Sequence, residues 1–362
     1  RSMNDGKHYT SSERLESGSA IVKYSYKTGL ATDTLATSKS VFEDASKGFD
    51  GYEFSADESM LMLTTESEGI YRHSYLANYY VFDIQNASTK PLTNFEKGKQ
   101  RLAAFSPSAN EVAFVRDNNI FIANITSNEE IQVTTDGEFN SIINGAADWV
   151  YEEEFGDDNG IFWSPDGSFL AYYRFDESAV REFSMPVYGS LYPDPYTFKY
   201  PKAGEENSKV SIFVYEVSKK RSTPVLHPKS EYIPRIKWGS SNKQLILMTM
   251  NRHQSILDLM MGNCENIGID GLVTRKIWTE QSDTYIDLND DIRFLKNGKS
   301  FVMTSERDGY NHLYLFSTDM TKEAKQLTQG DWDILEIYGM DQKRQEVYFS
   351  CSKKGATQTH LG

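Results

Sequence analysis

Cysteine is scarce in this sequence of 362 residues, which holds only Cys264 and Cys351. With so few thiols and no C-x-x-C pair, the chain is neither a disulfide scaffold nor a cysteine zinc site. No run approaches the ~18 successive apolar residues that a membrane-spanning helix needs. Proline is also sparse, at 10 residues, whereas aromatic residues make up 13% of the chain. Such a composition excludes a disordered or low-complexity protein.

Positive charge is in deficit, because 38 Lys and Arg face 52 Asp and Glu and leave a formal net charge of -14. An acidic surface repels nucleic acid and anionic membranes, so neither is expected as a partner. The balance favours cationic ligands instead.

Several catalytic and metal-binding motifs are missing from the sequence. It contains no G-x-S-x-G, so the serine of an α/β-hydrolase is absent from this chain. The six histidines show no H-x-x-x-H or H-E-x-x-H spacing, and residues 157–160 (DDNG) lack the alternating ligands of a calcium loop. No glycine-rich phosphate loop is present either. We therefore expect no metal, no cofactor and no catalytic residue in this chain.

The main positive signal is a repeated sequence pattern. Each copy has two apolar or aromatic positions around one residue, then a polar turn and an apolar strand, as in FWSPDGSFLAY at 162–172. Pro, Asp and Gly favour tight turns, so each copy predicts two antiparallel strands joined by a turn. Further copies share this order of residues at 104–115, 52–63, 236–247, 292–303, 337–349 and, truncated, 3–9.

About four strands every ~50 residues is typical of a β-propeller blade. We predict an all-β fold in which residues 1–362 form one incomplete β-propeller domain of about seven blades, each with four antiparallel strands. A β-sandwich or several small β-domains is the alternative, but sandwiches do not repeat one turn signature at a near-constant period. The abrupt ends at Arg1 and Gly362 predict that the chain is a piece of a longer protein.

Two segments interrupt the repeat. Residues 141–160 (SIINGAADWVYEEEFGDDNG) are inserted before the fourth copy, and residues 176–209 form a long inter-strand loop. Within the first, three glutamates in a row (152–154) stand between aromatic residues that would anchor a short helix against the propeller. A solvated helix face is the ordinary interpretation of such a run. A rigidly held carboxylate pair would also suit a primary ammonium, which offers three N–H donors and one charge.

A second candidate is the segment YRHSY at 71–75. As a strand end with one solvated arginine it would carry no function. Near the acidic segment, however, Arg72 would limit carboxylate repulsion and donate to a ligand carbonyl.

Together these motifs resemble the dipeptidyl peptidase IV group of the prolyl oligopeptidase family of serine peptidases. The strings NGAADWVYEEEF, RHSY and YPKAG carry the resemblance, with WSPDGSFLAYYRFD between the motifs. The likeness covers essentially the whole chain and looks closest to a bacterial member.

The resemblance implies an eight-bladed propeller that caps a C-terminal α/β-hydrolase domain, and neither that domain nor the last blade is in this chain. The missing domain would supply the serine, aspartate and histidine, so the full-length protein would be the enzyme and this chain its substrate-selecting part. By motif position, Glu153 and Glu154 would bind the free N-terminal ammonium of a peptide. Arg72 would contact a backbone carbonyl near the second residue. The family removes N-terminal dipeptides with Pro or Ala in the second position.

Two other functions stay open: a non-catalytic propeller that serves as a binding or scaffold module, and a tripeptidyl peptidase of the same family with a shifted ammonium site. Family members often carry a Phe-Arg pair in the sixth blade, whereas residues 285–291 (YIDLNDD) show no match, which leaves the preference at the first substrate residue open. The resemblance also implies a periplasmic or cell-surface location and the possibility of a homodimer.

Overall fold

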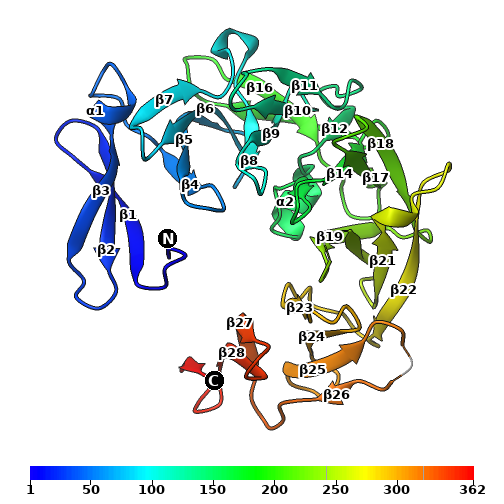
Figure 1. Ribbon diagram of the computed structural model, residues 1–362. Coiled ribbons are helices and arrows are strands. Elements are labelled where there is room, and N and C mark those ends of the chain that lie inside the picture. The colour runs from blue at the N-terminus through cyan, green and yellow to red at the C-terminus, as the bar shows by residue number, and fades with distance from the viewer. Residues whose placement is uncertain (242, 321) are drawn as a thin grey trace. The chain divides into compact units, whose positions relative to one another are not determined.

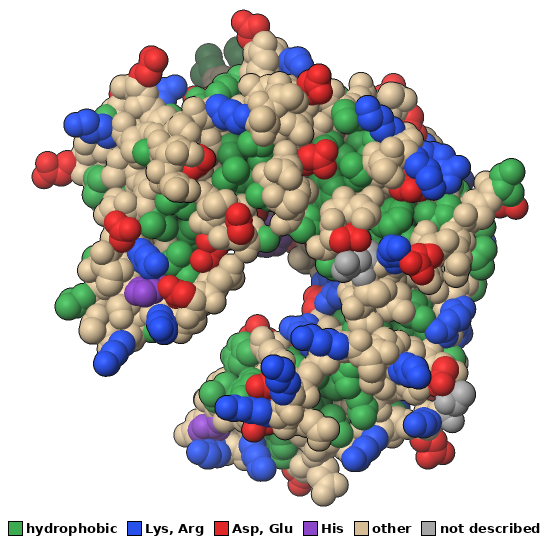
Figure 2. Space-filling model, in the orientation of Figure 1, with side chains coloured by type: hydrophobic (Ala, Val, Ile, Leu, Met, Phe, Trp, Pro, Cys, Tyr) green, Lys and Arg blue, Asp and Glu red, His purple; other side chains and the backbone are tan. Residues whose placement is uncertain are grey.

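The computed structural model describes residues 1–241, 243–320 and 322–362. The chain divides into two compact units, Arg1–Ser222 (unit 1) and Thr223–Gly362 (unit 2). Antiparallel strands are the main secondary structure of both units, and the helices are short (Figure 1). On the face shown in Figure 2, acidic and basic side chains are interspersed with hydrophobic ones.

Unit 1 opens with three antiparallel sheets that follow one another along the chain, ordered β1-β2-β3, β4-β5-β6-β7 and β11-β10-β9-β8. A four-residue helix and a 3-10 turn lie between their strands. The elements are β1 (His8–Arg14), β2 (Ser19–Ser25), β3 (Ala31–Thr37), α1 (Ser38–Val41), β4 (Gly51–Phe54), β5 (Met60–Gly69), β6 (Tyr75–Asp83), β7 (Ser88–Pro91), η1 (Phe95–Lys97), β8 (Arg101–Phe105), β9 (Glu111–Arg116), β10 (Asn119–Asn124) and β11 (Glu130–Gln132).

The next sheet of unit 1 has a split first strand. β12 (Ile142–Asn144) and β13 (Ile161–Trp163) both pair with β14 (Phe169–Asp176), and the residues between them carry α2 (Trp149–Glu154). On its other side β14 pairs with β17 (Lys209–Glu216). The predicted insertion at 141–160 is therefore an excursion from one strand of the sheet.

The connection predicted at 176–209 has secondary structure of its own. It contains an antiparallel hairpin, β15 (Glu182–Val187) with β16 (Asp194–Lys199), that pairs with no other described strand. Large side chains near its tip are exposed, among them Tyr188 and Leu191.

Unit 2 contains three more antiparallel sheets, ordered β19-β20-β21-β22, β23-β24-β25-β26 and β27-β28-β29. β18 (Arg221–Leu226) runs from the end of unit 1 into unit 2, where its last two residues pair in parallel with β22. The remaining elements are β19 (Tyr232–Trp238), β20 (Gln244–Met250), β21 (Ile256–Asn263), η2 (Cys264–Asn266), β22 (Leu272–Gln281), β23 (Ile292–Phe294), β24 (Ser300–Ser305), β25 (His312–Ser317), β26 (Lys325–Gln326), β27 (Ile334–Asp341), β28 (Glu346–Cys351) and β29 (His360–Leu361).

The repeated turn motif has one hydrogen-bond pattern in its clearest copies. The serine hydroxyl that opens the turn accepts from the backbone N–H five residues later: Phe169 to Ser164 at 3.0 Å, Glu111 to Ser106 at 3.2 Å and Met60 to Ser55 at 3.0 Å. A serine in this place satisfies a backbone donor that the turn would otherwise leave open. This local bond explains why the Ser-Pro-Asp type of sequence recurs.

Central strands are buried on both faces, since successive side chains of a strand point in opposite directions. In β5, Leu61 and Leu63 pack into the core cluster with Phe82, whereas Met62 packs into the neighbouring cluster with Phe114. β24 divides its residues between two clusters in the same way. Sheets packed face to face in sequence, with hairpin connections, are the blades of a propeller, so the predicted all-β propeller fold is confirmed. Among the described residues, the first and last sheets have three strands rather than four.

Candidate functional site

The helix α2 begins at a buried aspartate. The Asp148 carboxylate accepts from the backbone N–H of Tyr151 at 2.9 Å and from the hydroxyl of Ser208 at 2.6 Å. An aspartate at this position satisfies N–H groups that the first helical turn leaves without partners. Only 4% of Asp148 is exposed, and burial raises its pKa. Asp148 thus hydrogen-bonds both to the backbone of α2 and to Ser208, which lies 60 residues further along the chain.

Aromatic packing holds the body of α2 in place. The Tyr151 ring is buried and meets Phe155 and Phe175 edge to face, with centroid distances of 5.1 and 4.8 Å. Trp149 packs against Tyr200, with ring centroids 4.1 Å apart. Edge-to-face aromatic contacts each add stability of about 1 kcal/mol beyond area burial, so this short helix has a defined position.

Glu152 points into the protein. Its side chain is 1% exposed, and Oε1 accepts from the backbone N–H groups of His73 at 2.7 Å and Ser74 at 2.9 Å. The guanidinium of Arg101, itself 7% exposed, lies 3.9 Å from Oε2. Glu152 therefore joins α2 to the loop between β5 and β6 through Oε1, whereas Oε2 is buried without a hydrogen bond from a described residue.

Glu153 pairs with the arginine of that same loop. Arg72 donates through Nε to Oε2 at 2.9 Å and through Nη2 to Oε1 at 2.8 Å, a bidentate arrangement. The side chains are 67% and 28% exposed, respectively, so the pair faces solvent. The hydrogen bonds from Arg72 hold the pKa of Glu153 below its usual range. Glu153 is therefore ionised at neutral pH.

Glu154 ends the helix and is exposed. Among residues that the structure describes, no Lys, Arg or His nitrogen lies within 4 Å of its carboxylate. It consequently follows Glu153 on α2 as a carboxylate without a cationic partner among these residues, and it is open to a ligand from solvent.

A second buried acid lies near the start of α2. Glu177, just after β14, is 6% exposed, and burial, followed by repulsion from Asp148, raises its pKa to about 7. The charge of Lys199 opposes this shift. Glu177 thus titrates close to neutral pH, within range of the charge of Asp148 at the start of α2.

The described parts of the chain hold no group of three or more His, Cys, Asp and Glu side chains arranged for a metal ion. No helix among them is both long and apolar enough to cross a bilayer.

The structure brings Arg72 and Glu153 into direct contact although 81 residues separate them, and it places Glu154 next to them on α2. Sequence reasoning did not single out Asp148, Arg101 or the separate, buried position of Glu152. The residues just before the triplet offered one signal, because an aspartate three residues ahead of Tyr151 fits a helix cap.

A β-propeller with a carboxylate-bearing helix inserted into one blade is the class of protein that the fold and the site define. The model for the "Dipeptidyl peptidase IV (DPP IV) N-terminal region" family matches residues 55–361, and the chain belongs to this family. The predicted resemblance is thereby confirmed.

Similar proteins with known names are consistent with this family assignment. The chain is 32% identical over 330 residues to dipeptidyl peptidase 4 of Trichophyton rubrum, a match that covers 87% of this chain and 42% of that protein. It is 30% identical over 326 residues to dipeptidyl aminopeptidase B of Saccharomyces cerevisiae, covering 85% and 39%. The crystal structure of Porphyromonas gingivalis dipeptidyl peptidase 4 superposes with a TM-score of 0.89 and 40% identity, over 100% of this chain and 50% of that one. The chain thus spans about two-fifths of the length of these curated relatives.

Proposed function

We propose that this chain is the substrate-selecting propeller of a serine exopeptidase that removes dipeptides from peptide N-termini. In this proposal Glu153 and Glu154 bind the substrate's free ammonium group, and Arg72 donates to a backbone carbonyl near its second residue. The observation that carries it is the Arg72–Glu153 pair beside the unpartnered carboxylate of Glu154. The names of the matched relatives support the reaction class.

The charges of the site suit a primary ammonium. Two carboxylates and one guanidinium leave one net negative charge, which a single ammonium neutralises. An ammonium has three N–H donors, so it can bridge both carboxylates, whereas an acylated amine has no charge and only one donor. Arg72 binds Glu153 through Nε and Nη2, so its third guanidinium nitrogen, Nη1, remains for a carbonyl oxygen.

Bond cleavage belongs to a part of the protein outside this chain. We propose an α/β-hydrolase domain with serine, aspartate and histidine, since the chain has no G-x-S-x-G and covers less than half of its curated relatives. The propeller would then contribute by positioning: an amine held at a fixed distance from the nucleophile selects one peptide bond along the substrate. That distance would decide between dipeptide and tripeptide release.

Neutralising each carboxylate in the full-length protein tests this proposal. We expect Glu153→Gln and Glu154→Gln each to lower kcat/KM for a Gly-Pro chromogenic substrate by roughly 30-fold or more, because each removes one half of a charged hydrogen-bond pair. The melting temperature should barely change, since both side chains face solvent.

Glu129→Gln is the matched control, because it removes one exposed carboxylate of unit 1 from the turn before β11. It should leave kcat/KM within about twofold of the parent value. If Glu153→Gln and Glu154→Gln did the same, the ammonium assignment would be wrong.

A further inference from the structure

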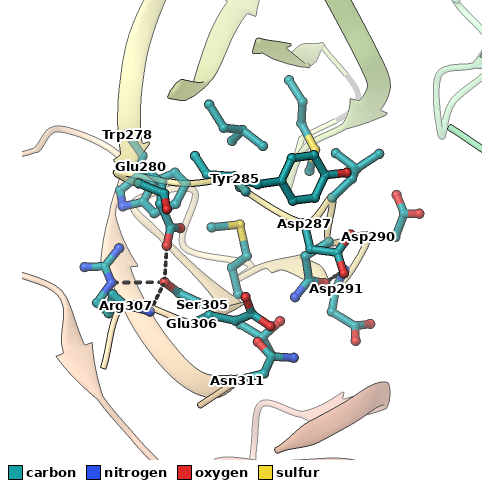
Figure 3. A pocket seen from close by; sticks show the side chains of 18 of the residues that line it. Trp278, Glu280, Tyr285, Asp287, Asp290, Asp291, Ser305, Glu306, Arg307 and Asn311 are labelled. Atoms are coloured by element: carbon teal, nitrogen blue, oxygen red, sulfur yellow. Dashed lines mark hydrogen bonds between the residues drawn. The ribbon is translucent and has the colours of Figure 1, made fainter. Parts of the chain in front are cut away.

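Unit 2 contains a cavity of about 840 Å³ that is separate in the chain from the glutamate helix. Its walls come from the end of β22, the connection at 282–291 and the end of β24 with the turn after it (Figure 3). A ligand of this cavity would bind independently of the role of Glu153 and Glu154.

The lining has an excess of negative charge. The lining contains three cationic side chains (Lys237, Arg293 and Arg307) and six carboxylates. The carboxylates are those of Glu280, Asp287, Asp290, Asp291, Glu306 and Glu336.

Part of this charge is already compensated within unit 2. Asp290 receives two hydrogen bonds from Arg235, at 2.6 and 2.9 Å. Asp291 accepts from the backbone N–H of Ile337 at 2.9 Å and lies 3.7 Å from Arg293. Asp290 and Asp291 are therefore held by groups of the cavity wall, and their negative charges are balanced by Arg235 and Arg293.

Three other carboxylates of the lining form no ion pair with the residues that the structure describes. Within the described ranges of the chain, no Lys, Arg or His nitrogen lies within 4 Å of Glu280, Asp287 or Glu306. Glu280 accepts one hydrogen bond, from the Ser305 hydroxyl at 2.5 Å, and burial raises its pKa. The three acids come from three separate segments and surround the same opening (Figure 3).

A buried hydroxyl supplies an independent sign of a missing partner. Thr304 lines the cavity and is only 2% exposed, yet no residue that the structure describes forms a hydrogen bond with its Oγ1. Leaving a buried hydroxyl unpaired costs about 1–3 kcal/mol, which a ligand that donates a hydrogen bond there would recover.

The remaining walls are aromatic and aliphatic. Trp278 and Tyr285 line the cavity with aromatic rings. Leu257, Ile286 and Met303 supply aliphatic surface. Ring faces attract cations, and aliphatic walls suit the methylene stem of a long basic side chain. A small hydrated metal ion would use neither feature.

We propose that this cavity binds the side chain of a lysine or arginine of a peptide. Its charged end would lie among Glu280, Asp287 and Glu306, with the Thr304 hydroxyl as a further acceptor and its stem along the apolar wall. A free polyamine offers the same chemical groups, and it is distinguished from a peptide in the test.

Binding of a capped peptide to the full-length protein tests the proposal by calorimetry. The probe is acetyl-Gly-Arg-Gly-amide, which has no free α-amine, and its neutral counterpart carries citrulline in place of arginine. We expect saturable binding of the arginine peptide and at least roughly tenfold weaker binding of the citrulline peptide. Glu280→Gln, Asp287→Asn and Glu306→Gln should each weaken the arginine peptide by about tenfold.

Two control variants locate the effect. Glu265→Gln removes an exposed acid of unit 2 that pairs with Lys243 at 2.7 Å, outside the cavity, and should leave the affinity unchanged. The double variant Glu153→Gln/Glu154→Gln should also bind the arginine peptide normally, which separates this proposal from the proposed function.

Four results with the peptides would overturn the assignment: no saturable binding at millimolar peptide, equal binding of the citrulline peptide, equal weakening by Glu265→Gln, or loss of binding in the Glu153→Gln/Glu154→Gln variant. Spermidine provides the last arm. If it bound at least roughly tenfold tighter than the arginine peptide and depended on the same three acids, the ligand would be a free polyamine and the peptide assignment would be wrong.

Discussion

At the residue scale, three adjacent glutamates of α2 meet three different environments. Glu152 is buried against two backbone N–H groups, Glu153 binds Arg72, and Glu154 faces solvent. Successive residues of a helix point about 100° apart, so one turn can serve structure and ligand binding at once. The buried member positions the loop that carries Arg72, and in the proposed function the other two bind the ammonium.

Glu177 gives a prediction for stability against pH. A carboxyl whose pKa is raised by burial to about 7 binds more protons in the folded state than in the unfolded state between pH ~4.5 and 7. Its contribution to the free energy of unfolding therefore falls as the pH rises through this window. We expect Glu177→Gln, which cannot ionise, to be more stable than the parent by about 1–3 kcal/mol at pH 8 and to match it near pH 4.5.

Melting temperatures of both proteins measured from pH 4.5 to 8 check this expectation. The gap between the two curves should open as the pH rises. A difference in melting temperature that stayed constant across the range would show that Glu177 does not titrate in this window. The raised pKa of Glu177 would then be wrong.

At the element scale, α2 depends on the point where the inserted segment leaves and re-enters its strand. Ala146 and Asn159 form an isolated bridge there, and a Cβ added to Gly160 would overlap the backbone of Gly145. Two backbones this close require glycine. The contact between residues 145–146 and 159–160 closes the insertion into a loop. We call this contact the base of the insertion, and α2 lies between its two sides and contacts the loop of Arg72.

Gly160→Ala should therefore push residue 160 away from the backbone of Gly145. We expect a loss of about 1–3 kcal/mol of stability together with a raised KM for the Gly-Pro substrate, because α2 moves with its base. Gly189→Ala is the control, since a Cβ there meets nothing within 4 Å and the residue is exposed. An unchanged KM in a destabilised Gly160→Ala protein would mean that the base does not position the helix.

The sequence predicted elements well where local signals set them. The Ser-Pro-Asp-Gly turn at 164–167 forms its own hydrogen bonds, so its recurrence marks the paired strands of each sheet. The hairpin β15–β16 was not predicted, because its strands are mostly exposed and lack the alternation of apolar and polar residues that reveals a half-buried strand. The split into β12 and β13 was missed because both halves are three residues long.

At the scale of the whole molecule, the site depends on contacts between distant parts of the chain. The motifs that hold Arg72 and Glu153 were recognisable in the sequence, but their bidentate pairing spans 81 residues. Local patterns cannot say which of three successive acids is buried, since that depends on the N–H groups of residues 73 and 74 and on Arg101. The cavity of unit 2 likewise combines segments whose individual sequences show no motif.

The family match shows that this chain belongs to the dipeptidyl peptidase IV N-terminal region. In the proposed function, the chemical step belongs to the rest of the protein. The chain's own task in the proposed function is recognition. The central claim is thus thermodynamic: the positive charge of a peptide's amine is recognised by Glu153 and Glu154.

The most direct measurement is a double-mutant cycle on that charge. It compares the dissociation constants of a Gly-Pro peptide with a free N-terminus and of its N-acetylated form, in the full-length protein and in the Glu153→Gln/Glu154→Gln variant. The account predicts that acetylation weakens binding at least roughly 100-fold in the parent protein and less than about threefold in the variant. An acetylation penalty of the same size in both proteins would contradict it.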